Sequence, residues 1–269
     1  MGDKNDKLHK SVQAQYGAAI SNPENPLRET TGSGKYADYG EGEVPEGLVC
    51  SSFGCGNPVA MSEVQSGQTV LDLGCGAGVD ILLAGQKVGP TGHVIGIDMT
   101  QAMIDAAQAN IKKAGVSNVE AKLGLVEDLP IEDNSIDLVI SNCVLNMSPD
   151  KEKVFAEIYR VLKPDGKMVV ADVVAQNLSP WGKRGVQAVA ACAGAGISES
   201  EYLQELQKSG LEDCKVLKRQ HYDAEYMAQM TLEAFPNWLK NRLTKLILTK
   251  MTSALTQKIW SACISARKP

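Results

Sequence analysis

The chain has 269 residues, which is enough for one substantial α/β domain or for one domain with an appendage. Hydrophobic residues make up 43% of it and charged residues 22%, as in ordinary globular proteins. The net charge of −5 argues against a nucleic-acid partner. The absence of any apolar run of about 18 residues argues against a membrane-spanning helix.

The cysteines indicate a reducing environment. There are seven of them, an odd number, and residues 1–7 are polar and lack the apolar core of a signal peptide. We therefore expect free thiols in the cytoplasm. The three histidines lie far apart and no two cysteines form a C-x-x-C pair, so we expect no bound metal ion.

The first 60 residues are predicted to form a short helix and a lid. Residues 4–17 have a helical pattern, whereas residues 18–60 are rich in Gly, Pro, Asn, Ser and Glu and show no sustained period. A loop of this length is either a functional lid or a disordered leader. The aromatic residues Tyr36, Tyr39 and Phe53 favour the lid, because disordered segments contain few aromatics.

From residue 70 onward, apolar runs alternate with helical patterns. The runs that we interpret as strands cover residues 70–73, 93–97, 119–123, 136–141 and 167–174. The helical patterns cover residues 79–88, 101–114 and 151–162, each followed by a breaker: Gly89-Pro90, Gly115 or Pro164-Asp165-Gly166. This alternation predicts a doubly wound α/β fold with a parallel sheet.

The last hundred residues are less regular. We expect helices at 182–192 and 198–208, a strand at 214–219, a helical stretch from 224 to 258 interrupted at Pro236, and a final strand at 260–266. Within this region, residues 237–259 combine apolar residues at helical spacing with unopposed lysines. Such a helix either lies on a membrane surface or covers the core with its basic face in solvent, and the second is the more common arrangement.

The run 70–73 leads into a loop with glycines at 74, 76 and 78. Glycines allow the backbone to approach a ligand where a Cβ atom would collide with it. Their spacing differs from the G-x-G-x-x-G pattern of dinucleotide-binding proteins. Asp98 ends the next strand, where a carboxylate can accept hydrogen bonds from both ribose hydroxyls. The loop therefore predicts a nucleotide-type pocket at the edge of the sheet.

With Asp72 in front of it, this loop resembles the D-x-G-x-G-x-G signature of class I S-adenosylmethionine-dependent methyltransferases. The resemblance implies a Rossmann-like sheet of seven strands with an antiparallel last strand, and S-adenosylmethionine as cofactor. We expect three parts: an N-terminal helix and a lid (1–60), a cofactor-binding core (61–220) and a helical segment with a final strand (221–269). The implied cofactor-binding residues are Phe53, Asp72, Gly74, Gly76, Gly78, Asp98, Met99, Val126, Glu127, Asn142 and Cys143.

Three cysteines follow elements that end near this pocket. Cys55 lies in the predicted lid, Cys143 follows the fourth strand, and Cys192 lies beyond the fifth strand. Together they could converge on one thiophilic atom, because thiolates bind soft centres such as trivalent arsenic. Alternatively, each is a small buried hydrophobic residue, as many cysteines are.

Longer sequence words extend the resemblance to the arsenite S-adenosylmethionine methyltransferases. The matching words, between residues 16 and 220, are Val44-Pro-Glu46, Gly54-Cys-Gly-Asn-Pro58, Gly96-Ile-Asp-Met-Thr100, Ser141-Asn-Cys-Val144 with Asn146, and Pro149-Asp-Lys151. The resemblance implies that Cys55, Cys143 and Cys192 bind the arsenic. Phe53 stands where animal and algal relatives have a tyrosine near the cofactor. The sequence Cys192-Ala-Gly-Ala-Gly196 departs from the family's Cys-x-Gly-Gly-Ala. The extra N-terminal cysteine of the animal and algal enzymes has no clear counterpart here, and only proximity to Cys55 suggests Cys50.

The resemblance implies methylation of arsenite or methylarsenite, with a thiol reductant such as thioredoxin or glutathione as partner. Two alternatives remain open: a C- or O-methyltransferase of the quinone and sterol type, and a non-catalytic thiol-based arsenic binder. We interpret Cys75, Cys214 and Cys263 as packing residues. The oligomeric state and the number of methyl groups added are not predicted.

Overall fold

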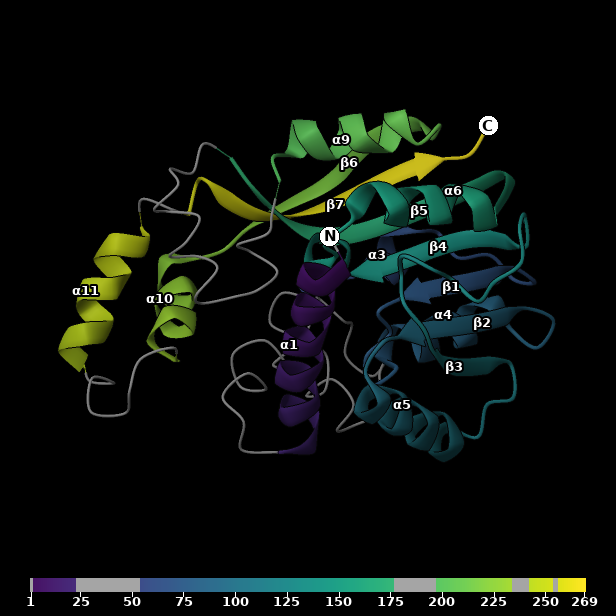
Figure 1. The fold of residues 1–269 in the computed structure, drawn as a ribbon, viewed down its shortest axis with the longest axis horizontal. Helices are drawn as coiled ribbons and strands as arrows, with labels where there is room; N and C mark the ends of the chain where they lie inside the picture. The colour runs from purple at the N-terminus through teal and green to yellow at the C-terminus, as the bar shows by residue number, and fades with distance from the viewer. Residues whose placement is uncertain (1, 23–53, 177–196, 234–241, 254–255) are drawn as a thin grey trace.

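The computed structural model describes residues 2–22, 54–176, 197–233, 242–253 and 256–269. Its strands are β1 (Thr69–Leu73), β2 (His93–Asp98), β3 (Val119–Leu123), β4 (Ile136–Asn142), β5 (Leu162–Ala175), β6 (Glu212–His221) and β7 (Ile259–Arg267). They form one seven-stranded sheet in the order β3-β2-β1-β4-β5-β7-β6 (Figure 1). β1 to β5 pair in parallel, whereas β7 pairs antiparallel with both β5 and β6. The predicted fold class is thereby confirmed.

The helices described are α1 (Gly2–Ser21), α3 (Pro58–Met61), α4 (Val79–Val88), α5 (Gln101–Ala114), η2 (Leu145–Met147, a 3-10 turn), α6 (Lys151–Val161), α9 (Glu199–Lys208), α10 (Ala224–Glu233) and α11 (Arg242–Thr252). Their ends carry local signals. Gly115 ends α5 with a φ of 67°, and its N–H group donates to the carbonyls of Ile111 and Lys112. Ser198 and Glu201 form a capping box at the start of α9.

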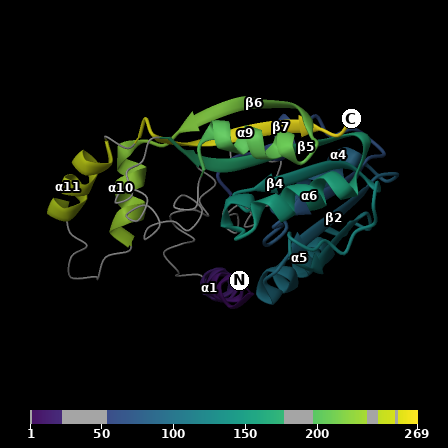
Figure 2. The same ribbon diagram turned by 45° about the horizontal axis from the view of Figure 1, so that its top comes forward.

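Two hydrophobic cores lie on opposite faces of the sheet because successive strand residues point to opposite sides. On β1, Leu71 faces the core that contains α6 and α9, whereas Val70 faces the core that contains α3, α4 and α5. Val94 and Ile95 on β2 divide in the same way. The sheet is therefore covered by helices on both faces (Figure 2), as a parallel sheet must be.

The strands and helices between residues 69 and 161 match the predicted ranges to within one residue at each end. The next strand does not, because β5 begins at Leu162 and continues through the turn predicted at residues 164–166. Asp165 has a φ of 63°, and the β4–β5 register shifts between Ile136 and Leu138. The breaker residues thus produce a distortion inside a longer strand. β4 pairs with Leu162 before them and with Lys167 after them, and Lys268 exchanges backbone hydrogen bonds with Asp165 and Gly166.

The basic helix α11 differs from its predicted role. Leu248 packs against Ala228 and Leu232 of α10, and these three buried residues form a cluster of their own, separate from the sheet cores. The two helices extend away from the end of the sheet (Figures 1 and 2). The interpretation of this stretch as a core-covering helix is therefore wrong. The helix predicted at 182–192 lies outside the described residues. Among the residues that are described, no helix has both the length and the apolar character needed to cross a membrane.

Candidate active site

A cavity opens at the carboxyl ends of β1, β2 and β4, where the strand order changes direction. The empty space in the cavity and its open mouth together amounts to about 910 Å³. Its walls come from the glycine loop, the ends of β2 and β4, and helix α1. The residues that line it include His9, Val12, Tyr16, Gly74, Gly76, Asp98, Met99, Val126, Glu127, Asn142 and Cys143.

The glycine loop is folded tightly against the end of β2. The N–H groups of Gly74 and Cys75 both donate to the carbonyl of Ile97, at 2.7 and 3.0 Å. Gly74 has a φ of 76°, and a Cβ atom added there would overlap the side chain of Val144. Glycine is therefore required at position 74 both by the backbone conformation and by the close approach of Val144.

Asp98 joins the end of β2 to the glycine loop. Its carboxylate accepts hydrogen bonds from the N–H groups of Gly76 at 3.1 Å and Thr100 at 2.8 Å. Burial raises the pKa of Asp98, while these two N–H donors act in the opposite direction. The side chain is held in place at the cavity wall, where a ribose hydroxyl could add a further donor.

Two of the predicted cofactor residues lie behind the wall and do not line the cavity. Gly78 begins α4 with a φ of 93°, and a Cβ atom there would lie 3.3 Å from the side chain of Ala107. Asp72 is buried, and its Oδ1 atom has no hydrogen-bond partner among the described residues. Burial, then the charges of Asp80 and Asp98, raises the pKa of Asp72 well above its ordinary value.

These carboxyl groups make the site suitable for a cationic ligand. Asp80 and Asp98 line the cavity and Asp72 stands directly behind it, and their mutual repulsion is relieved by positive charge. S-adenosylmethionine carries a sulfonium and an ammonium group, and its adenosine part requires an apolar slot. The residues present therefore fit the cofactor predicted from the sequence.

The far end of the cavity contains Val126 and Glu127, which follow β3. The Glu127 carboxylate accepts a hydrogen bond from Ser148 Oγ, and its Oε1 atom lies 3.2 Å from His9 Nε2. Glu127 therefore connects the loop after β3 with η2 and with helix α1. Both contacts involve the same carboxylate oxygen, Oε1.

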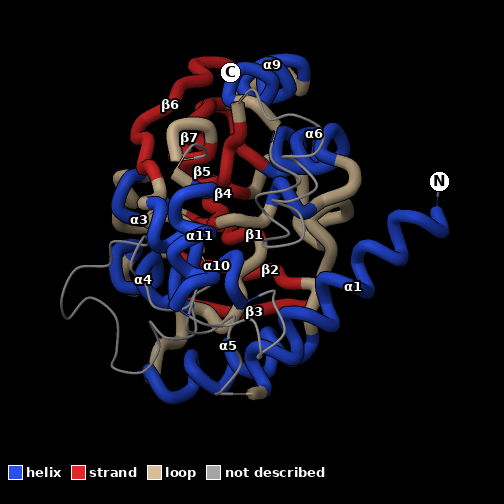
Figure 3. Tube along the Cα trace, turned by 90° about the vertical axis from the view of Figure 1, so that its left-hand side faces the viewer, coloured by secondary structure: helices blue, strands red, loops and turns tan. Residues whose placement is uncertain are grey.

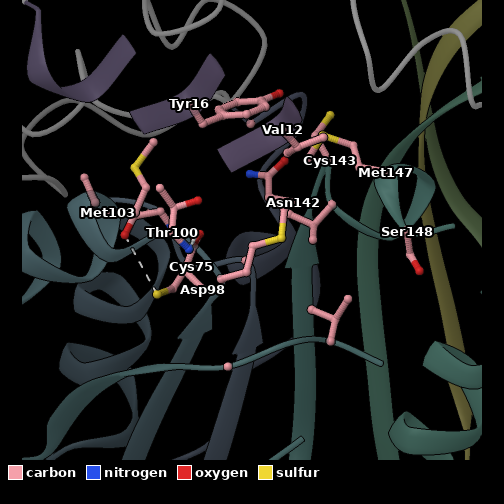
Figure 4. Close-up of a pocket in the computed structure, with 18 of the residues that line it drawn as sticks. Val12, Tyr16, Cys75, Asp98, Thr100, Met103, Asn142, Cys143, Met147 and Ser148 are labelled. Carbon is pink, nitrogen blue, oxygen red and sulfur yellow. Dashed lines mark hydrogen bonds between the residues drawn. The ribbon is translucent and has the colours of Figure 1, made fainter. Parts of the chain in front are cut away.

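Helix α1 covers this end of the cavity, which was not predicted from the sequence. It runs beside α5 (Figure 3), and Gln13 Nε2 donates to the carbonyl of Met99 at 2.8 Å. Figure 4 shows Val12 and Tyr16 reaching the cavity from this helix, opposite Asp98 and Asn142. The spacing of His9, Val12 and Tyr16 places them on one helical face, and this was the available signal.

Cys55 and Cys143 are joined by a disulfide bond although they are 88 residues apart in sequence. Their Cα atoms are 5.8 Å apart, and both residues are buried. Cys143 has a φ of 63°, which for a residue with a Cβ atom costs about 1–3 kcal/mol and requires support from its surroundings. Cys143 N donates to the carbonyl of Ala171 at 2.8 Å, and Cys55 Sγ lies 3.6 Å from the same oxygen.

Asn142 holds the Cys55 segment against β4. Its Oδ1 atom accepts from the N–H groups of Cys55 and Gly56 at 2.9 and 3.1 Å. Its Nδ2 atom donates to the carbonyl of Gly56 at 2.7 Å and to Asp80 Oδ2 at 3.1 Å. A Cβ atom at Gly54 would overlap the Asn142 amide. Asn142 therefore lines the cavity and also anchors the segment that contains Cys55.

Three other cysteines, Cys75, Cys214 and Cys263, lie in the described part of the chain, and none of the three is in a disulfide bond. Cys75 and Cys263 are buried free thiols whose pKa values are raised, mainly by burial. Cys214 is only partly buried on β6, so its predicted place in the core is correct in part. Cys192, Cys50 and Phe53 lie outside the described residues, and the roles predicted for Cys192 and Phe53 stay predictions.

This sheet order, with a glycine loop after β1 and an acidic residue after β2, defines a class I methyltransferase architecture. The family model described as "Methyltransferase domain" matches residues 64–233. The chain belongs to the methyltransferase domain family.

Within this family the chain is similar to several named proteins. It is 53% identical over 122 residues to an arsenite methyltransferase of Halobacterium salinarum, which covers 45% of this chain and 31% of that protein. It is 30% identical over 225 residues to an arsenite methyltransferase of Aquipseudomonas alcaligenes, covering 79% of this chain and 64% of that protein. The chain thus spans less than two thirds of the length of these relatives.

Among solved structures, the chain is similar to an arsenic(III) S-adenosylmethionine methyltransferase from Chlamydomonas reinhardtii. The TM-score is 0.66 with 27% sequence identity, over 92% of this chain and 75% of that chain.

Proposed function

We propose that the protein methylates trivalent arsenic, as arsenite or methylarsenite, with S-adenosylmethionine as methyl donor. The observation that carries the proposal is the contact between Cys55 and Cys143 at the wall of the cofactor cavity. The similarity to arsenite methyltransferases of two organisms supports the same substrate.

The thiols of Cys55, Cys143 and Cys192 are the proposed arsenic ligands. Thiolate sulfur is a soft ligand suited to a soft, thiophilic centre. Three sulfurs around trivalent arsenic leave its lone pair free to act as a nucleophile. When bound, S-adenosylmethionine would supply an electrophilic methyl group for in-line attack by the arsenic lone pair, with S-adenosylhomocysteine as the leaving group.

The chain contributes mainly positioning and a water-poor environment. Asn142 holds the Cys55 segment, the strand-end turn holds Cys143, and helix α1 covers the cavity with Val12 and Tyr16. Asp80 and Asp98 complement the positive charge of the donor and keep it oriented. No general base is required, because the attacking lone pair carries no proton.

The disulfide in the structure corresponds to the oxidised form of two of these ligands. Methyl transfer raises the formal oxidation state of arsenic by two. Two cysteine thiols can supply the two electrons that return it to the trivalent state, and they become a disulfide. A thiol reductant such as thioredoxin or glutathione then reduces that disulfide by thiol–disulfide exchange, which requires a reducing compartment such as the cytoplasm.

The proposal is tested by incubating the protein with arsenite, S-adenosylmethionine and a thiol reductant, and by separating the arsenic species by chromatography. Methylated arsenic is the expected product, and its absence overturns the proposed activity. Tight arsenite binding without turnover instead indicates a thiol-based arsenic binder.

Two cysteine variants sharpen the test. Cys143→Ser should abolish turnover and leave S-adenosylmethionine affinity nearly unchanged. Cys214→Ser is the matched control, because Cys214 is a free cysteine on β6 that does not line the cavity, and it should retain turnover. Loss of cofactor binding together with turnover in Cys143→Ser would contradict the role given to Cys143.

A further inference from the structure

Behind Cys143 lies a buried polar network that the cofactor site does not use. Its centre is Asn146 in the 3-10 turn η2, which is fully buried. Asp172 on β5 and Lys151 at the start of α6 form hydrogen bonds with its backbone. The buried Asp172 lies between Val and Ala residues in the second half of β5, and a buried carboxyl group in such surroundings calls for a structural or functional reason.

Every polar group of the Asn146 backbone is engaged. The N–H group donates to Asp172 Oδ2 at 3.1 Å, and the carbonyl accepts from Lys151 Nζ at 3.0 Å. The side-chain amide donates to the carbonyl of Val173 at 2.6 Å. Lys151 Nζ also donates to the carbonyl of Ser148 at 3.3 Å. The turn is therefore held from β5 on one side and from α6 on the other.

The turn held in this way begins at Cys143. Asn142 pairs with Ala171 in the parallel β4–β5 register, so Asp172 is the next residue along β5. The left-handed backbone of Cys143 directs the chain out of the strand and into η2. Such a conformation in a residue other than glycine persists only where surrounding contacts enforce it. The contacts that surround it are the bond from its own N–H group to the carbonyl of Ala171 and, three residues further on, the bonds of Asn146.

Asp172 is itself fixed from several elements. Its Oδ1 atom accepts the N–H of Val173 at 3.1 Å, Tyr202 of α9 places its hydroxyl 3.5 Å from Oδ2, and Lys151 of α6 faces it with a positive charge. These contacts support the orientation in which the Asp172 carboxyl group accepts the N–H of Asn146.

We propose that Asp172 is a positioning residue that, together with Lys151, holds the turn 143–148 so that the Cys143 thiol meets Cys55 at the cofactor cavity. The residue touches neither thiol nor cofactor and acts through Asn146. Its importance for catalysis rests on the proposed role of Cys143 as an arsenic ligand, whereas its effect on thiol placement does not.

The test measures the equilibrium for disulfide formation between the Cys55 and Cys143 thiols. The reduced chain of 269 residues is equilibrated in glutathione buffers and quenched with an alkylating agent, and the fraction of Cys55–Cys143 disulfide is measured by mass spectrometry. This equilibrium gives the effective concentration of one thiol toward the other. Asp172→Ala should lower it about tenfold or more, because small misplacements of paired groups have large effects. Asp172→Asn keeps an oxygen for Asn146 and should recover most of the loss.

Asp137→Ala is the matched control. Asp137 also accepts a backbone N–H, from Thr69 at 2.8 Å, and binds a lysine, Lys163, but it does so at the amino end of β4. The Asp137→Ala substitution should change the effective concentration of the two thiols by less than about twofold. An unchanged value in Asp172→Ala, or an equal loss in Asp137→Ala, overturns the proposal.

A second pair of variants covers the case in which Asp172→Ala does not fold. Lys151→Met should lower the effective concentration several-fold, with Lys163→Met as its control, and no effect of Lys151→Met overturns the proposal. Arsenite titration of the wild-type protein separates the two proposals. Failure to bind arsenite removes the proposed function but leaves the thiol measurement as a test of Asp172.

Discussion

His9 Nε2 on helix α1 lies 3.2 Å from Glu127 Oε1 in the loop after β3, and this contact fastens the N-terminal helix over the cofactor cavity. Gln13 provides a second attachment at the carbonyl of Met99. The helix packs beside α5 and contributes Val12 and Tyr16 to the cavity wall. Cofactor exchange therefore requires α1 to move or the cavity to be entered from its open side.

His9→Ala should weaken S-adenosylmethionine binding because it releases one attachment of this helix. A hydrogen bond of this kind is worth about 1 kcal/mol, so the dissociation constant should rise about fivefold, measured by calorimetric titration. Lys10→Ala, at an exposed neighbouring position, should leave the constant unchanged. Equal affinities of His9→Ala and wild type would show that the contact does not retain the cofactor.

Gly74→Ala should both destabilise the domain and remove cofactor binding. The substitution combines a left-handed backbone with overlap against Val144, a cost of about 1–3 kcal/mol in the free energy of unfolding. Gly115→Ala is the control, since Gly115 also has a positive φ but nothing lies within 4 Å of its added Cβ atom. Denaturant unfolding should show a loss in both variants, and cofactor titration should show a loss only in Gly74→Ala.

Asn142→Ala should release the segment that contains Cys55, because the backbone N–H groups of Cys55 and Gly56 lose their acceptor. We expect arsenite affinity to fall about tenfold, given one or two lost hydrogen bonds of about 1 kcal/mol each. Asn118→Ala loses two comparable bonds, to the carbonyls of Gly85 and Gly89 away from the cavity. If that control loses arsenite affinity to the same degree, the effect belongs to general destabilisation.

The raised pKa of Asp172 predicts that the free energy of unfolding depends on pH. Burial raises its pKa from an ordinary value of 3.8 to about 7 in the folded protein. Between these values the folded state binds the proton more tightly than the unfolded state, so the contribution to stability is full below about pH 4. It is lost as the pH rises toward 7, and it amounts to about 4 kcal/mol for a shift of this size.

The Asp172→Asn variant cannot titrate at this position and should lack this component. The difference in unfolding free energy between wild type and Asp172→Asn should therefore move in favour of the variant from pH 4 to pH 7 and then level off. Urea unfolding at several pH values measures it. A difference that stays constant over this range would contradict the raised pKa.

Much of the core could be predicted from the sequence alone. The strands and helices between residues 69 and 161 follow from apolar periodicity and from breaker residues, which depend only on near neighbours in the chain. The glycine loop and Asp98 could be placed together at one edge of the sheet, because both follow neighbouring parallel strands, and in the structure both line the cavity. The convergence of Cys55 and Cys143 was expected from the elements they follow, and the structure joins them.

Contacts between distant segments were decided only by the tertiary structure. β5 continues past Pro164-Asp165-Gly166 because β4 pairs with it on both sides and Lys268 bonds to Asp165 and Gly166. Helix α11 packs against α10 and not against the sheet. The placement of α1 over the cavity depends on His9 and Gln13 meeting residues 86 to 118 positions away. Periodicity records that a side chain is buried, but it does not record which partner buries it, and that choice depends on the order and register of the assembled sheet.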